Sequence, residues 1–138
     1  MELKPYQQSV IDDLATYLGI LAEHPDLRKA YKEFWQQKGI AAETYKNNVP
    51  GVPHVCVKVP TAGGKTFIAV NALKPIFDAF AAASPTRPQV VVWLVPSLTI
   101  LEQTVKNLAD PQHPYRQKLN ALFRNRVQVY ERRELLIE

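Results

Sequence analysis

The chain has 138 residues, of which 46% are hydrophobic and 22% are charged, and its formal net charge is +4. This length suits a single domain with a core, and the composition argues against extensive disorder. The modest positive charge permits contact with a phosphate backbone but does not require it. The single cysteine, Cys56, can form no disulfide within the chain, which suits a reducing cytoplasm. No apolar run reaches the length of a membrane span, so we expect no membrane partner.

Two helices are expected at the beginning of the chain. Apolar residues recur at helical spacing between residues 5 and 22, which predicts an amphipathic helix. A second helix is expected between Pro25 and Gly39, and it carries an aromatic stripe. We interpret this stripe as a packing surface against the first helix or a sheet, although a partner surface is an alternative. Residues 41–53 have the composition of a polar linker.

Three β-strands are expected in the rest of the chain, at residues 54–59, 90–95 and 126–130. The first two are rich in β-branched residues, as buried parallel strands are, and Cys56 is expected to be buried there. Helices between and around them complete an alternating pattern. This pattern predicts an α/β fold, a parallel sheet with flanking helices.

The helices expected among these strands follow from apolar spacing. One begins at Lys65 and continues to residue 83, with a kink or break near Lys74 because Pro75 follows. Another covers residues 98–109, and a shorter helix covers residues 115–123.

The most informative motif is the sequence Val-Pro-Thr-Ala-Gly-Gly-Lys-Thr at residues 59–66, between an expected strand and an expected helix. Glycines such as Gly63 and Gly64 let backbone N–H groups approach phosphate oxygens, and a helix N-terminus adds partial positive charge. Lys65 would reach the β- and γ-phosphates of ATP, and the Thr66 hydroxyl would bind Mg²⁺. The alternative is a glycine turn followed by an ordinary exposed lysine.

The segment Pro60-Thr61-Ala62-Gly63-Gly64-Lys65-Thr66 resembles motif I of superfamily-two helicases and translocases. This resemblance implies that all seven residues bind ATP, that Lys65 is catalytic, and that Thr66 holds Mg²⁺ through the nucleotide. Ala62 stands where the family commonly has glycine. Because alanine tolerates a positive φ poorly, the loop geometry is either altered there or has a negative φ.

Two other segments extend this resemblance. Residues 3–7, Leu-Lys-Pro-Tyr-Gln, are similar to the opening of many such enzymes, which implies that Gln7 reads adenine. The alternative for Gln7 is a solvated polar residue near a helix start. Residues 90–109 resemble motif Ia, which implies that Ser97, and with it Gln103 and Thr104, contacts a DNA backbone. Ser97 is equally explained as the N-cap of its helix.

Within that superfamily the chain most resembles the restriction (Res) subunit of type III restriction-modification enzymes. The segments on which this resemblance rests are residues 57–66 and 95–116. The resemblance implies the ATP-binding portion of a DNA-dependent ATPase, a helicase-like translocase that uses ATP and Mg²⁺. It also implies two partners, double-stranded DNA and a modification (methyltransferase) subunit.

Residues 1–138 are therefore expected to be the N-terminal part of a RecA-like helicase ATP-binding domain, a partial P-loop NTPase domain. The stretch at about 24–40 is interpreted as a helical insertion. Family motif II, an Asp-Glu box, and a second lobe are not found, so we expect this chain alone to be inactive as an ATPase. The alternatives are a non-catalytic docking module that binds a nucleotide or another anion, and a P-loop enzyme of another family.

Overall fold

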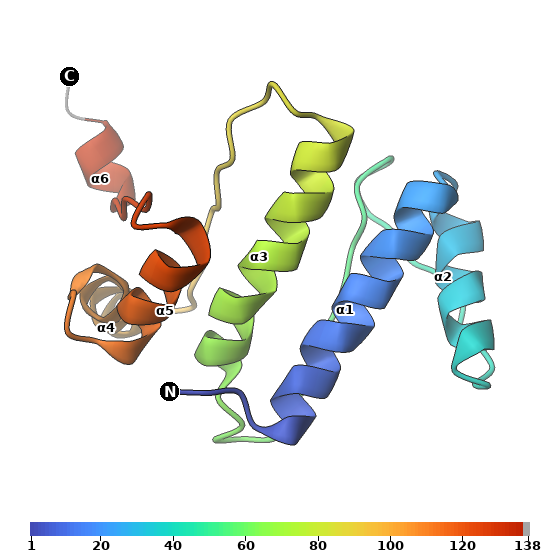
Figure 1. Ribbon diagram of the computed structural model, residues 1–138, viewed down its shortest axis with the longest axis horizontal. Coiled ribbons are helices and arrows are strands. Elements are labelled where there is room, and N and C mark those ends of the chain that lie inside the picture. The colour runs from blue at the N-terminus through green and yellow to red at the C-terminus, as the bar shows by residue number, and fades with distance from the viewer. Residues whose placement is uncertain (137–138) are drawn as a thin grey trace.

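The computed structural model describes residues 1–136, and these residues form six α-helices and no β-strand. Figure 1 shows α1 and α3 side by side, with their N-terminal ends at the same end of the molecule. α2 lies beyond α1, and α4 and α5 lie on the other side of α3. The helices are α1 (Pro5–Glu23), α2 (Leu27–Gln37), α3 (Lys65–Ala83), α4 (Leu98–Ala109), α5 (Pro114–Phe123) and α6 (Arg132–Leu135).

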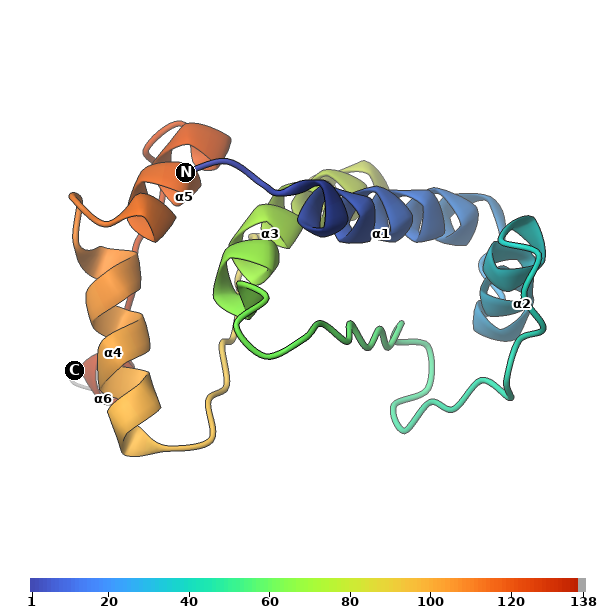
Figure 2. The same cartoon turned by 90° about the horizontal axis from the view of Figure 1, so that it is seen from below.

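The expected α/β fold with its parallel sheet is wrong for residues 1–136. Residues 54–59, 90–95 and 126–130 have no strand pairing. The first two lie in long extended connections: in Figure 2 one lies below α1, and the other descends from α3 to the start of α4. A β-branched sequence shows that a segment suits a pleated surface. A strand forms only where a neighbouring strand also satisfies its N–H and C=O groups, and no such neighbour is present in this part of the chain.

The helix boundaries follow from local capping. The Asp26 carboxylate accepts hydrogen bonds from two backbone N–H groups in the first turn of α2. Ser97 Oγ accepts from Ile100 N at the start of α4, and His113 Nδ1 accepts from Tyr115 N at the start of α5. These side chains satisfy N–H groups that a helix leaves unpaired in its first turn.

α3 is continuous from Lys65 to Ala83, although Pro75 lies inside it. The expected break is therefore wrong, and the alternative of a kink near Lys74 stays a prediction. Proline removes one backbone hydrogen bond and crowds the carbonyl group four residues earlier, at Asn71. The contacts that α3 makes with α1 and α5 hold the helix together across this defect.

The core consists of two clusters. The first joins α1 and α2 through the buried residues Tyr17, Ile20 and Ala30, with Phe34 against them. The Tyr17 and Phe34 rings meet edge to face, with centroids 5.6 Å apart. The aromatic stripe of α2 thus packs against the first helix, as predicted.

The second cluster joins α3, α4 and α5. Val70, Leu108 and Leu119 are its buried members, one from each helix. Trp93 and Val127, from two of the segments expected to be strands, pack against it while partly exposed. These two segments therefore contribute side chains to the core without forming a sheet.

Much of the apolar surface expected to be buried is exposed. Val92 and Leu94 are 78% and 86% exposed, and Val55 and Val57 are also exposed. Cys56 is exposed as well, so the expectation that it is a buried core residue is wrong. Within residues 1–136 there is no sheet to bury these side chains of the two extended segments.

By length and composition alone, α3 is apolar enough to cross a membrane. On that criterion the expectation that no run reaches this length is wrong. The criterion is weak, because a core helix satisfies it too, and α3 contributes Phe67, Ile68 and Val70 to the buried interior.

Candidate phosphate-binding site

The loop at residues 60–64 folds into a tight turn before α3. The Gly63 N–H donates a hydrogen bond to the Pro60 carbonyl oxygen at 2.9 Å. Ala62 and Gly64 both have left-handed backbone conformations, with φ of 61° and 73°. The possibility of a negative φ at Ala62 is thus wrong, and the loop holds an alanine in a conformation that favours glycine.

Two glycines are required in this turn for different reasons. A Cβ atom on Gly63 would lie 2.7 Å from the Pro60 carbonyl oxygen, which belongs to the backbone and has little freedom to move. A Cβ atom on Gly64 would lie 2.4 Å from Gln7 Nε2, and its positive φ independently favours glycine. The loop therefore depends on both residues.

The first turn of α1 is hydrogen-bonded to this loop. The Tyr6 hydroxyl and Gln7 Nε2 both donate to the Gly63 carbonyl oxygen, at 2.7 Å and 3.0 Å. Gln7 is only 5% exposed, and its Oε1 accepts from Lys4 N at 2.9 Å. The solvated alternative for Gln7 is therefore wrong, and folding brings its side chain to the loop across 56 residues.

The N-terminus of α3 has unpaired backbone donors. Gly64 is its N-cap residue, and no side chain caps the helix. The first intrahelical bond runs from Ile68 N to the Gly64 carbonyl oxygen, and within residues 1–136 no acceptor is found for the N–H groups of Gly64, Lys65 and Thr66. Such donors, reinforced by the helix dipole, suit an anion.

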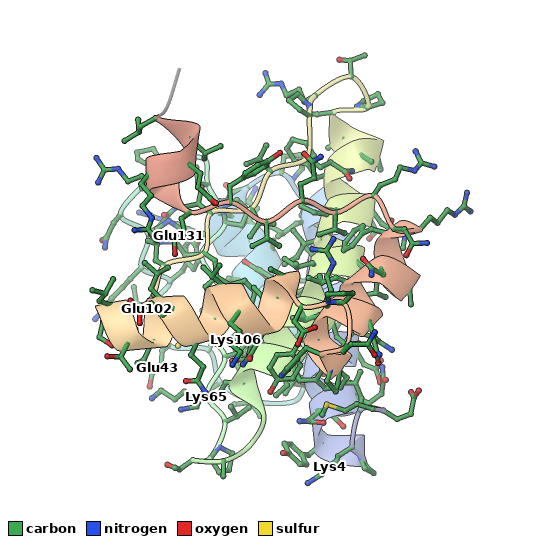
Figure 3. The ribbon with its side chains drawn as sticks, turned by 90° about the vertical axis from the view of Figure 1, so that its left-hand side faces the viewer. Lys4, Glu43, Lys65, Glu102, Lys106 and Glu131 are labelled. Carbon is green, nitrogen blue, oxygen red and sulfur yellow. The ribbon has the colours of Figure 1, made fainter. Side chains whose placement is uncertain are left out.

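Lys65 and Thr66 lie at this same helix start. Lys65 is exposed, and no carboxylate in the described part of the chain pairs with its ammonium group. Figure 3 shows Lys65 at the beginning of α3 and Lys4 just before α1. Thr66 is half-buried, and no cluster of three metal-binding side chains occurs in residues 1–136.

A groove of about 470 Å³ lies beside the loop. Its lining comes from α1, α3 and the two extended segments, and apart from Lys65 the residues described around it are apolar. An apolar groove offers an anion no hydrogen bonds, whereas the glycine turn presents free backbone N–H groups.

The residues predicted to contact DNA lie on α4. Ser97 Oγ is engaged as the helix cap, Gln103 is exposed and Thr104 is half-buried. Within residues 1–136, no hydrogen bond links them to the phosphate loop. The alternative in which Ser97 caps its helix is confirmed, and a contact with DNA stays a prediction.

Sequence reasoning missed Tyr6. Its hydroxyl makes the shortest hydrogen bond to the loop, yet Tyr6 is 42% exposed and separated from Gly63 by 57 residues. In the sequence, only the position of Tyr6 beside Gln7, at the start of an expected helix, pointed to this role.

The family model for "Type III restriction enzyme, res subunit" matches residues 1–135. The chain belongs to this family, which relates it to helicases and restriction subunits and confirms the resemblance drawn from its motifs. Neither the curated proteins nor the solved structures include a significant match to the chain.

Proposed function

We propose that this chain is the ATP-binding portion of a DNA-dependent ATPase, a helicase-like translocase of the type III restriction subunit kind. One observation carries the proposal: a glycine turn leads into an uncapped helix N-terminus, beside an exposed lysine that has no acidic partner among residues 1–136. Family membership supports it further.

Each group at the turn has a role in this proposal. The N–H groups of Gly64, Lys65 and Thr66 donate to phosphate oxygens, and the Lys65 ammonium offsets negative charge at the β- and γ-phosphates. Thr66 supplies a hydroxyl ligand for the Mg²⁺ that accompanies ATP. Such an ion would supply positive charge that offsets the negative charge of the phosphate groups.

The DNA-facing part of the proposal concerns α4. Ser97, which caps this helix, and the helix residues Gln103 and Thr104 would contact the backbone of double-stranded DNA. Family membership supports this assignment and a modification (methyltransferase) subunit as partner. The proposed location is the cytoplasm.

Calorimetric titration of Mg-ATP and Mg-ADP tests the phosphate site. We expect the wild-type chain to bind both, and Lys65→Ala to bind at least about tenfold more weakly, because a charge-assisted contact is lost. Lys58→Ala is the matched control, since Lys58 is an exposed lysine in the extended segment before the loop. Its affinity should equal that of the wild type.

Absence of nucleotide binding by the wild type, or equal losses in Lys58→Ala and Lys65→Ala, would contradict the proposal. We also expect negligible ATP turnover by this chain, because its sequence contains no Asp-Glu box to complete a metal site. Turnover by purified wild type above the Lys65→Ala level would overturn that expectation.

A further inference from the structure

The Gly63 carbonyl group is held from one side by two side chains of α1. Tyr6 Oη and Gln7 Nε2 both donate to this oxygen, and Gly63 is buried. The Gly63–Gly64 peptide bond is trans, because the described chain has no cis peptide bonds. In a planar trans peptide, the N–H of the second residue points opposite to the C=O of the first. Fixing the Gly63 C=O toward α1 therefore fixes the Gly64 N–H in the opposite direction.

Gln7 is placed to hold the loop and not to face solvent. Both ends of its amide are engaged, one with the Gly63 oxygen and the other with Lys4 N, and the side chain is almost wholly buried. Gly64 also lies directly against it, since even a methyl group there would approach Nε2 to 2.4 Å. This packing leaves Gln7 little access to a nucleotide base.

We infer that Tyr6 and Gln7 are positioning residues for phosphate binding: they orient the Gly63–Gly64 peptide so that the Gly64 N–H faces the triphosphate. The inference rests on the proposed function and deepens it. It also distinguishes a positioning role from a base-reading role. Loss of a residue that orients the loop weakens the binding of every triphosphate equally, whereas loss of a residue that reads adenine weakens the binding of ATP alone.

Three ligands separate these roles: Mg-ATP, Mg-GTP and inorganic tripolyphosphate with Mg²⁺, which has no base. Tyr6→Phe and Gln7→Met remove the hydrogen bonds while keeping side chains of similar size. We expect each variant to bind all three ligands about three- to tenfold more weakly, as expected for the loss of a hydrogen bond. Tyr130→Phe and Gln8→Met are matched controls on exposed residues and should bind as the wild type does.

A second measurement needs no ligand. ¹⁵N relaxation at Gly64 should report a rigid backbone in the wild type and both controls, with an order parameter of about 0.85. We expect this order parameter to be lower in Tyr6→Phe and Gln7→Met. Unchanged far-UV circular dichroism would show that the helices are retained in each variant.

The possible results test the positioning role and the proposed function separately. A loss confined to Mg-ATP would make Gln7 a base reader and overturn the positioning role. Equal affinities in wild type and both variants, or an unchanged Gly64 order parameter, would also overturn it while leaving the phosphate site intact. Failure of the wild type to bind any of the three ligands would overturn the proposed function, and the positioning role with it.

Discussion

Ala62 holds a backbone conformation that residues with a Cβ atom seldom adopt, with φ of 61° inside the phosphate loop. For such residues the left-handed conformation costs about 1–2 kcal/mol. We expect Ala62→Gly to raise the free energy of unfolding by about 1 kcal/mol, because the relief of strain exceeds the added flexibility of the unfolded chain. Urea denaturation measures this difference.

Ala82→Gly provides the control for that substitution. Ala82 is exposed in α3, where glycine is expected to lower the free energy of unfolding by as much as about 1 kcal/mol. If both substitutions destabilise the protein equally, Ala62 is not strained.

Tyr17 makes the stability of the folded protein depend on pH in the alkaline range. Burial, and to a smaller extent the neighbouring Tyr45 and Tyr31, raises the pKa of Tyr17 above its ordinary value of 10.0. The stability that this shift contributes is present below pH 10 and is lost as the pH rises through the folded-state pKa. We expect Tyr17→Phe to reduce the loss of stability above pH 10, as measured by thermal unfolding across a pH series.

Tyr17→Phe should also stabilise the protein at neutral pH, by about 1 kcal/mol. The buried Tyr17 hydroxyl has no hydrogen-bond partner among residues 1–136, so its removal eliminates an uncompensated desolvation cost. Tyr130→Phe, at an exposed hydroxyl, should change neither quantity. A lower melting temperature for Tyr17→Phe than for Tyr130→Phe would contradict this explanation.

At the scale of elements, α3 links the two clusters of the core and carries the loop at its N-terminus. It does so despite Pro75, which in a helix interior is about 3 kcal/mol less favourable than alanine. We expect Pro75→Ala to raise the free energy of unfolding by about 1–3 kcal/mol in urea denaturation, without weakening nucleotide binding.

Ile76→Ala is a useful comparison for Pro75→Ala. It alters the adjacent, partly exposed position of the same helix without restoring a backbone hydrogen bond, so no gain in stability is expected. A loss of stability in Pro75→Ala would mean that the ring makes packing contacts worth more than the missing bond.

The elements differ in how far sequence predicts them. α1, α2, α4 and α5 follow from apolar spacing and, for α4, from the capping residue Ser97, which are local properties. The strands expected at 54–59 and 90–95 required partners elsewhere in the chain, and local composition contains no information about those partners. Pro75 failed as a breaker because tertiary contacts outweighed its local effect.

At the scale of the whole molecule, the candidate site lies where α1 and α3 begin side by side (Figure 1). The motif at residues 60–66 identified the loop, and the opening of the chain identified Gln7. The hydrogen bonds that join these segments depend on folding across more than fifty residues, which no short pattern describes. The contribution of Tyr6 was therefore visible only in three dimensions.

The exposed extended segments have a practical consequence for the behaviour of this chain in solution. Residues 90–94 contain no charge and no proline, and their backbone groups have no strand partner among residues 1–136. Such a segment is a template for pairing with the same segment of another molecule. Self-association should therefore rise with protein concentration, and a charged side chain in place of the exposed Val92 is the change that would oppose it most directly.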